Sequence, residues 1–266
     1  MKALKFVLAL LGLLAATAAE AGRPDSVSVL FVGNSYTYCH DMYKMVGELA
    51  ENTYVHPGRK LKVGCRARTP GGWSFERHAS SAETAEAIAR GGYDFVVLQE
   101  QSARPAMPTQ TVARQTYPYA FALDSLVHAH NPEAKVVFYM TWGHKYGCQD
   151  EHDYPLIDTY EGMQNRLATS YLEMAYRTGA LCAPVGQAWQ RVRRERPDII
   201  LYGEDSSHPS VAGSYLAANV IFCTITGAPY QSYYFAGLDP AVAEYLQQVA
   251  QQTVLGNRRL INLTPR

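Results

Sequence analysis

Short apolar segments rich in β-branched residues alternate along this chain with longer segments of helical character. The clearest apolar segments are residues 27–32 and 95–98. Both are continuously apolar, which is typical of strands that are buried on both faces of a parallel sheet. Because both faces of such a sheet must be covered, the alternating helices are expected to lie on its two sides. The sequence therefore predicts an α/β protein that forms a three-layer α/β/α sandwich.

The alternation continues through the chain and indicates about five strands in one parallel sheet. The predicted strands are residues 27–32, 61–65, 95–98, 136–140 and 181–183. The predicted helices are residues 42–54, 81–89, 111–130, 160–177, 211–226 and 241–255. We find no internal repeat, low-complexity tract or linker, so one domain is the simplest interpretation.

The first 21 residues have the features of an export signal. Lys2 and Lys5 precede an apolar run at residues 6–16, and residues 19–21 form an A-x-A cleavage site. The apolar run is shorter than the roughly 20 residues that a spanning helix needs, so we expect no stable insertion in a membrane. The sequence predicts a signal peptide at residues 1–21, a mature domain at residues 22–266, and a periplasmic or extracellular location.

Charge and cysteine content exclude several classes of partner and cofactor. The 24 Lys and Arg residues balance 24 Asp and Glu residues, so the chain lacks the basic excess that binding to nucleic acid requires. No CxxC occurs, so neither a zinc ribbon nor a redox pair is supported, and we expect no metal and no cofactor. Export permits disulfides, and we expect buried thiols with at most one bridge, although the sequence does not choose a pairing. The five cysteines are Cys39, Cys65, Cys148, Cys182 and Cys223.

A serine follows the first predicted strand, at the entry to a helix. In a parallel sheet, ligands bind at the carboxyl ends of the strands, where loops and helix N-termini meet. Ser35 lies at such a point, where free backbone N–H groups favour a developing negative charge. Ser35 is therefore a candidate nucleophile, but a serine in this position also suits a helix N-cap.

A carboxylate and an imidazole lie three residues apart near the other end of the chain. At that spacing the side chains of Asp205 and His208 can face each other across one turn. An imidazole held by a carboxylate can take a proton from a serine. The alternative is a turn capped by the aspartate, with Pro209 at the first position of the next helix. A metal site is not supported, since no HExxH motif or second nearby ligand accompanies the pair.

Four segments, in order, resemble the conserved blocks of the SGNH (GDSL-like) hydrolases. They are Gly33-Asn34-Ser35 after the first strand, a glycine motif at residues 71–74, a polar amide after the third strand, and Asp205-x-x-His208-Pro209. The resemblance spans the chain from its first strand to its penultimate helix. It implies a flavodoxin-like fold and a serine esterase of the acetylhydrolase type, with Ser35 as nucleophile and His208 and Asp205 as base and partner.

By the same resemblance, three donors would stabilise the oxyanion: the N–H groups of Ser35 and Gly72 and a side-chain amide of the third block. Two departures from the family pattern follow. Asn34 stands where many members have aspartate, a position that is not itself catalytic. The asparagine of the third block is replaced by glutamine, and alignment of the strand end favours Gln101 slightly over Gln99.

Aromatic residues near the expected site suggest a carbohydrate substrate. Trp73, Trp142 and Tyr36 are predicted to bind substrate, because flat rings with polar tips pack against sugar faces. The leading hypothesis is an exported serine esterase that removes a short acyl group, chiefly acetyl, from a small or polymeric carbohydrate ester. The alternatives are a lipid esterase or lysophospholipase, and a non-catalytic glycan-binding protein of the same fold. The absence of Gly-x-Ser-x-Gly argues against an α/β-hydrolase elbow.

Overall fold

The computed structural model describes residues 26–53, 61–149 and 153–264. The predicted signal peptide at residues 1–21 lies outside these ranges. Within them, no helix is long and apolar enough to cross a membrane.

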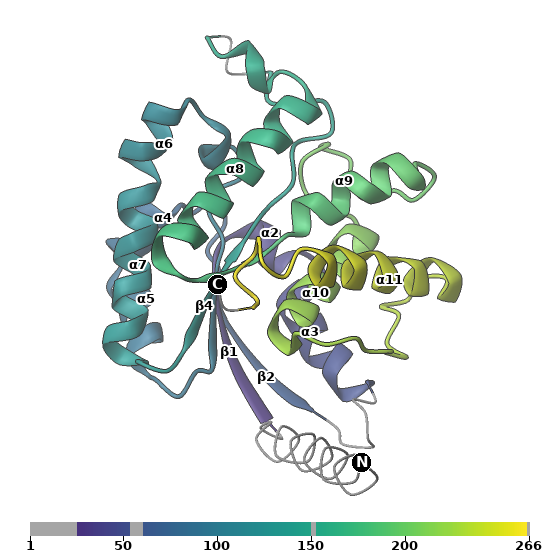
Figure 1. Ribbon diagram of the computed structural model, residues 1–266, viewed down its shortest axis with the longest axis horizontal. Coiled ribbons are helices and arrows are strands. Elements are labelled where there is room, and N and C mark those ends of the chain that lie inside the picture. The colour runs from purple at the N-terminus through teal and green to yellow at the C-terminus, as the bar shows by residue number, and fades with distance from the viewer. Residues whose placement is uncertain (1–25, 54–60, 150–152, 265–266) are drawn as a thin grey trace, which may run out of the picture.

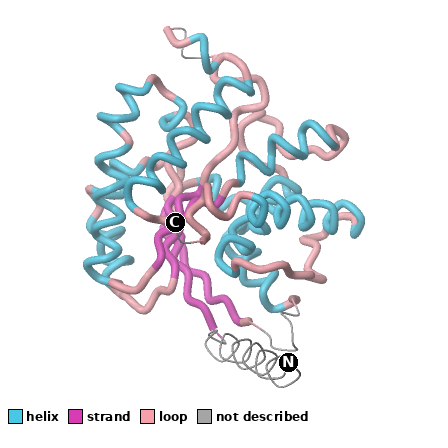
Figure 2. Tube along the Cα trace, in the orientation of Figure 1, coloured by secondary structure: helices cyan, strands magenta, loops and turns pink. Residues whose placement is uncertain are grey.

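A single five-stranded parallel sheet forms the centre of the molecule (Figures 1 and 2). Its strands are β1 (Ser26–Val32), β2 (Lys62–Arg68), β3 (Phe95–Leu98), β4 (Lys135–Tyr139) and β5 (Leu181–Ala183). Their order is β2-β1-β3-β4-β5, which is the flavodoxin-like order. The predicted α/β/α class and the expected strand number are therefore confirmed. In this register Val32 pairs with both Arg68 and Leu98, so the ends of β1, β2 and β3 lie side by side.

Two groups of helices cover the two faces of the sheet (Figure 1). One group comprises α4 (Phe75–Ala79), α5 (Ala82–Ala89), α6 (Thr109–Gln115), α7 (Tyr117–His130) and α8 (Tyr160–Thr178). The other comprises α3 (Met42–Glu51), α9 (Val185–Glu195), α10 (Val211–Thr226) and α11 (Pro240–Gly256). Helix α10 lies between α3, α9 and α11 and is buried along almost its whole length, as expected for a helix with apolar residues on all its sides.

Two of the longer helical regions differ from the prediction, and the short helix α4 was also not predicted. The helix predicted at residues 111–130 is two helices, α6 and α7, which meet at Thr116. Pro118 at the second position of α7 has no N–H for a continuous helix and fits only near a helix start. Helix α9 was not predicted, because its arginines obscure an apolar face that packs against the core through residues such as Trp189 and Val192.

All five cysteines are free thiols, so the structure contains no bridge between them. Cys148, Cys182 and Cys223 are buried, while Cys39 and Cys65 are half-buried. Burial raises the pKa of the Cys65 thiol to about 12, which keeps this group protonated and unreactive near neutral pH. The expectation of mainly buried thiols is confirmed.

Candidate active site

Ser35 is the first residue of a short helix, α2 (Ser35–Tyr38), that follows the carboxyl end of β1. The N-cap of this helix is Asn34, whose Oδ1 accepts a hydrogen bond from the N–H of Tyr36 at 3.2 Å. The Ser35 hydroxyl therefore does not cap the helix. It lies 2.7 Å from Nε2 of His208, a residue 173 positions later in the chain.

Asp205 holds the other side of the imidazole. Its Oδ2 lies 2.5 Å from Nδ1 of His208, while its Oδ1 accepts hydrogen bonds from the N–H groups of Ser207 at 3.0 Å and His208 at 2.8 Å. Both interpretations of the Asp-x-x-His motif thus hold at once: the aspartate caps a turn and also binds the histidine. Partial burial works against the charged carboxylate, but the hydrogen bonds from His208 and the backbone outweigh it and lower the pKa of Asp205. Asp205 is therefore an anion that orients His208.

The segment that carries this pair, residues 203–208, is a series of turns without a helix or strand. Ser206 has a φ of 61°, in the left-handed region that non-glycine residues seldom adopt. The next helix, α10, begins at Val211 with Ser210 as its N-cap, so Pro209 precedes the cap and is not the first helical residue as the sequence suggested. We call residues 203–208 the base loop.

Gly72 lies in the loop after β2, and its backbone has a φ of 68° that favours glycine. We call residues 33–37, around the predicted nucleophile Ser35, the nucleophile segment. The loop after β2 is tied to this segment, because Nδ2 of Asn34 donates a hydrogen bond to the carbonyl of Trp73 at 2.8 Å. Among the described residues, neither the N–H of Ser35 nor that of Gly72 donates a hydrogen bond. Both predicted backbone donors thus remain open to a substrate oxygen.

Gln99 lies behind the nucleophile segment. Its side chain is fully buried, and its Oε1 accepts hydrogen bonds from the N–H of Asn34 and the hydroxyl of Thr37, both at 2.9 Å. Its Nε2 donates to the carbonyl of Glu100. A side chain committed in this way supports the backbone around Ser35, which disfavours Gln99 as the oxyanion donor.

Gln101 lies at the rim and is half-buried. Its Oε1 accepts hydrogen bonds from the N–H groups of Ala103 at 3.0 Å and Arg104 at 3.2 Å, and its Nε2 donates to the Ser102 hydroxyl at 3.2 Å. A glutamine amide carries two N–H bonds, so one remains for a further acceptor. The assignment of Gln101 as the third donor stays a prediction.

Two of the three aromatic residues predicted to bind substrate are buried. Trp142 is fully buried and Tyr36 is 2% exposed, so neither ring offers a surface to a sugar. Their rings stack with centroids 4.5 Å apart, and Trp142 stacks in turn on Trp189 at 3.9 Å. This burial removes Trp142 and Tyr36 from the side chains expected to contact substrate.

Trp73, the third predicted aromatic residue, keeps part of its surface exposed. The guanidinium of Arg68 lies 5.1 Å from the centroid of this ring, and the centroid of the His78 ring also lies 5.1 Å away. Trp73 directly follows Gly72, so an accessible aromatic surface lies beside the predicted oxyanion donors.

His78 is a buried residue that sequence analysis did not connect with the site. Its Nε2 donates to the carbonyl of Gly33 at 2.9 Å, and its Nδ1 accepts from the hydroxyl of Thr84 at 3.0 Å. Burial lowers the pKa of His78 to about 4, so the ring is neutral near pH 7. His78 thus supports the nucleophile segment from behind, and nothing in the local sequence marks this long-range contact.

Glu100 is a second buried residue that sequence analysis did not connect with the site, and its side chain is fully buried. Its Oε1 accepts hydrogen bonds from the N–H of Phe75 at 2.9 Å and that of Gln101 at 2.6 Å, which joins α4 to the end of β3. Its Oε2 has no partner among the described residues. Burial raises the pKa of Glu100 to about 7. The one signal in the sequence is the run of four polar residues, 99–102, directly after a buried strand.

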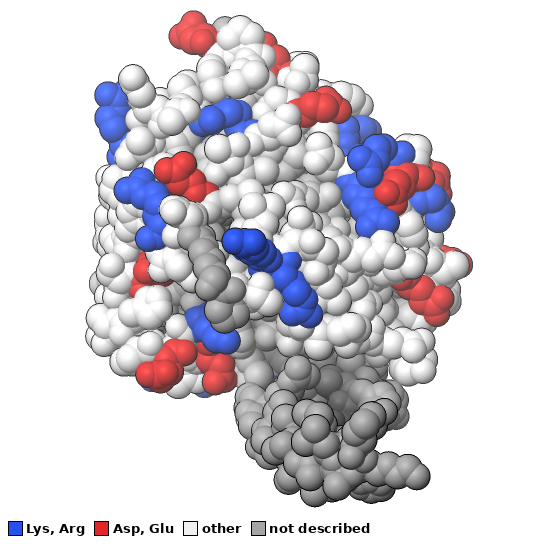
Figure 3. Space-filling model, viewed as in Figure 1, with Lys and Arg blue, Asp and Glu red and all other residues white. Residues whose placement is uncertain are grey.

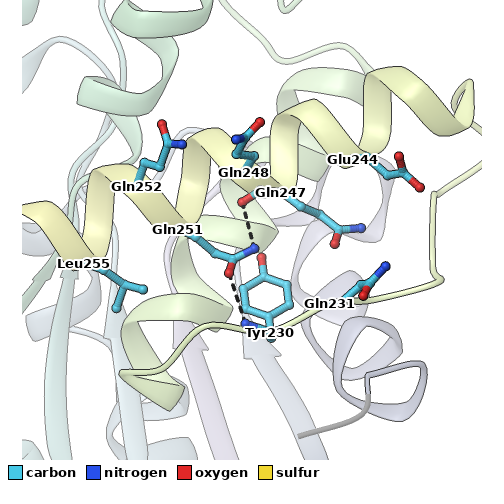
Figure 4. A pocket seen from close by; sticks show the side chains of 8 residues that line it. All are labelled: Tyr230, Gln231, Glu244, Gln247, Gln248, Gln251, Gln252 and Leu255. Carbon is cyan, nitrogen blue, oxygen red and sulfur yellow. Dashed lines mark hydrogen bonds between the residues drawn. The ribbon is translucent and has the colours of Figure 1, made fainter. Parts of the chain in front are cut away.

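We looked for other candidate sites in the part of the chain that the structure describes. Among the described residues no group of three potential metal ligands occurs. A cavity of about 580 Å³ lies against α11, where glutamines and Tyr230 line it (Figure 4). None of Ser35, Asp205 and His208 lines that cavity. On the face drawn in Figure 3, basic and acidic residues are interspersed.

Comparison with known proteins agrees with this geometry. No family model matches the chain, and no curated protein matches it. A solved structure from Slackia heliotrinireducens, described as an SGNH hydrolase, is 31% identical, with a TM-score of 0.60 over 75% of this chain and 99% of that one.

Two further solved structures share the fold at lower identity. A DUF4886 family protein from Bacteroides uniformis is 18% identical, with a TM-score of 0.62 over 86% of this chain and 95% of that one. The acetylxylan esterase Axe2 from Geobacillus stearothermophilus is 18% identical, with a TM-score of 0.52 over 73% of this chain and 92% of that one. The flavodoxin-like sheet, the ordered blocks and the 31% identity over nearly the whole Slackia protein show that this chain belongs to the SGNH hydrolases, a family of serine ester hydrolases.

Proposed function

We propose that this chain is an exported serine esterase that removes acetyl or another short acyl group from a carbohydrate. The observation that carries the catalytic part is the continuous hydrogen-bonded chain from Ser35 Oγ through His208 to Asp205. Binding alone requires no such chain, so it favours catalysis over a non-catalytic glycan-binding role.

The geometry supports a two-step acyl transfer. Ser35 Oγ attacks the ester carbonyl carbon while His208 Nε2 takes the hydroxyl proton, and Asp205 stabilises the resulting imidazolium. The carbonyl oxygen becomes an oxyanion, for which the N–H groups of Ser35 and Gly72 and the amide of Gln101 are the proposed donors. When the intermediate collapses, the C–O bond of the ester breaks and His208 returns the proton to the departing sugar oxygen.

Deacylation repeats the sequence with water as the nucleophile. His208 takes a proton from the water as its oxygen attacks the acyl carbon of the Ser35 ester. Collapse of the second intermediate releases the carboxylic acid, and the proton on His208 returns to Ser35 Oγ. No step needs a cofactor.

The alcohol group is inferred from the surroundings of the triad. The exposed large apolar side chains near the site are Tyr38, at 43%, and Tyr146, at 61%. Tyr146 follows Lys145, whose N–H donates to the carbonyl of Ser206 in the base loop. Together with Trp73, these rings are amphipathic surfaces that suit a sugar better than an alkyl chain. The shared fold of an acetylxylan esterase is consistent with this choice.

A serine-reactive fluorophosphonate tests the nucleophile. We expect one label per chain, lost in Ser35→Ala and retained in Ser81→Ala. Ser81 caps α5 and donates to Glu83, and it makes no contact with the triad. His208→Ala should lower kcat by several orders of magnitude, and Asp205→Ala should leave more residual activity. Undiminished labelling of Ser35→Ala would contradict the proposal, as would activity lost to a chelator and restored by a divalent ion.

Substrate class and export need separate measurements. Turnover should be highest with acetyl esters, fall as the acyl chain lengthens, and extend to acetylated xylo-oligosaccharides. Preference for long-chain or phospholipid esters would instead support the lipid esterase. For export, mass spectrometry of protein from the periplasm or medium should find a chain that begins at Gly22, whereas an intact Met1 there would contradict cleavage.

A further inference from the structure

The hydroxyl of Tyr36 makes a second connection between the two segments that carry Ser35 and His208. Tyr36 follows Ser35 in α2, and Ser207 precedes His208 in the base loop. The Tyr36 hydroxyl lies 2.6 Å from Ser207 Oγ, and the Ser35 hydroxyl lies 2.7 Å from His208 Nε2. Two adjacent hydrogen bonds therefore join the same pair of segments, one residue apart on each side.

The ring of Tyr36 is held in place by the core. It stacks on Trp142 with an interplanar angle of 5°, and the His208 ring packs edge-on against it with centroids 5.4 Å apart. Burial raises the pKa of the Tyr36 hydroxyl far above its ordinary value, so the group stays a neutral phenol at working pH. A buried phenol needs a hydrogen-bond partner, and Ser207 supplies one.

Ser207 is fixed at three atoms. Besides the contact of its hydroxyl with Tyr36, its carbonyl accepts from Trp142 Nε1 at 3.0 Å and its N–H donates to Asp205 Oδ1 at 3.0 Å. The side chains of Asp205 and His208 are themselves about half exposed, at 50% and 42%. The base loop therefore depends on Ser207 for a rigid attachment to the buried aromatic rings.

We propose that Tyr36 is a positioning residue that sets the distance between the Ser35 hydroxyl and the His208 imidazole. This inference rests on the proposed function, because it concerns the geometry of proton transfer between those two groups. A shift of about 1 Å between reacting groups can lower a rate by about 10²-fold. Loss of the Tyr36–Ser207 bond should therefore reduce kcat without removing any group that contacts substrate.

Tyr36→Phe tests this role, because it removes one oxygen and leaves the stacked ring in place. We expect kcat for p-nitrophenyl acetate to fall about tenfold or more with KM little changed. Ser207→Ala should give a similar loss. The double variant should be no slower than the worse single variant, because both substitutions remove the same bond. The rate of fluorophosphonate labelling at Ser35 should fall in the same proportion.

The matched control is Tyr93→Phe. Tyr93 is 6% exposed, its hydroxyl donates to the carbonyl of Ala87 at 3.1 Å, and it precedes β3 at the opposite end of the sheet. This variant should lose a comparable amount of thermal stability without loss of kcat. A kcat of Tyr36→Phe within twofold of wild type would overturn the inference, as would losses that multiply in the double variant.

Fluorophosphonate labelling of Ser35 needs no ester substrate, so it can test the positioning role separately from the proposed function. Normal labelling of the wild type with an unchanged rate in Tyr36→Phe overturns the positioning role alone. A wild-type protein that neither hydrolyses esters nor reacts with the fluorophosphonate overturns the proposed function, and the positioning role with it.

Discussion

Replacement of Gln99 by alanine tests how the nucleophile segment is supported. The Gln99 side chain is fully buried, and its Oε1 accepts from both the N–H of Asn34 and the hydroxyl of Thr37. These two residues flank Ser35 and Tyr36 in the chain. Gln99→Ala leaves both donors without their acceptor in a site closed to water.

The expected cost follows from these two donors and the lost side-chain volume. A buried donor left without a partner costs about 1–3 kcal/mol, and one buried methylene contributes about 0.8 kcal/mol. The free energy of unfolding should therefore fall by about 3–7 kcal/mol. For a domain of this size, that corresponds to a decrease in Tm on the order of 10 °C.

Thermal unfolding and steady-state kinetics should be measured on three variants. Gln99→Met fills most of the volume without an acceptor, so it should retain the hydrogen-bond part of the loss and little of the cavity part. Gln101→Ala should instead lower kcat by about 10²-fold with KM little changed, because its hydrogen bond would form mainly in the transition state.

Two results would refute this reasoning. A Tm of Gln99→Ala within about 2 °C of wild type would show that the buried hydrogen bonds do not support the segment. A large loss of kcat at Gln99 with a near-normal Gln101 variant would identify Gln99 as the oxyanion donor. Small losses of kcat at both positions would mean that Ser35 and Gly72 suffice.

Three further predictions concern residues around the site. Because the pKa of Glu100 is raised, its carboxyl stays protonated in the folded state up to about pH 7. The free energy of unfolding of wild type, compared with that of Glu100→Gln, should therefore fall by about 3 kcal/mol from pH 4.5 to pH 7. Parallel curves of unfolding free energy against pH for the two proteins would contradict this. Because Ser206 has a positive φ, Ser206→Gly should be neutral or stabilising, whereas Ser206→Val should lower the free energy of unfolding by about 1–3 kcal/mol. Denaturant titrations measure both, and equal effects of the two substitutions would contradict this prediction. Asn34→Ala removes the cap of α2 and the hydrogen bond to Trp73, so it should lower the free energy of unfolding by about 2–4 kcal/mol. The control Asn52→Ala removes an exposed amide contact and should cost under about 1 kcal/mol. Equal losses in the two variants would refute the importance of the Asn34–Trp73 bond.

The framework of the site could be predicted because it depends on local patterns and on topology. Continuously apolar strands indicated a parallel sheet, and in such a sheet the segments after successive strands meet at one edge. Ser35 follows β1 and Gly72 follows β2, which pairs with β1. The base loop was harder to place, since it follows no strand of the sheet. Only its motif connected it with Ser35.

The role of each aromatic residue could not be predicted, because composition does not distinguish a ring at the rim from a ring beneath it. Tyr36, Trp73 and Trp142 all lie at or near the carboxyl ends of strands. Trp73 remains accessible on a turn, whereas Trp142 is covered by Trp189 and Tyr36. Helix α9 supplies Trp189, and that helix was not expected. The burial of Trp142 therefore depended on an element that the sequence pattern concealed.

The supporting role of the polar residues behind Ser35 was not predicted, for a related reason. Gln99, His78 and Asn34 bind backbone atoms that lie 65, 45 and 39 positions away in the chain. Such contacts leave no periodic signal, because each depends on the final register of β1, β2 and β3. They also explain how Ser35 is held in place on a four-residue helix. Helix α2 is too short to be stable alone, so its position comes from these buried partners. Ser35 is thus positioned by its tertiary contacts. We therefore expect substitutions at the buried positions behind it to act chiefly through stability, whereas substitutions of oxyanion donors at the rim should act through kcat.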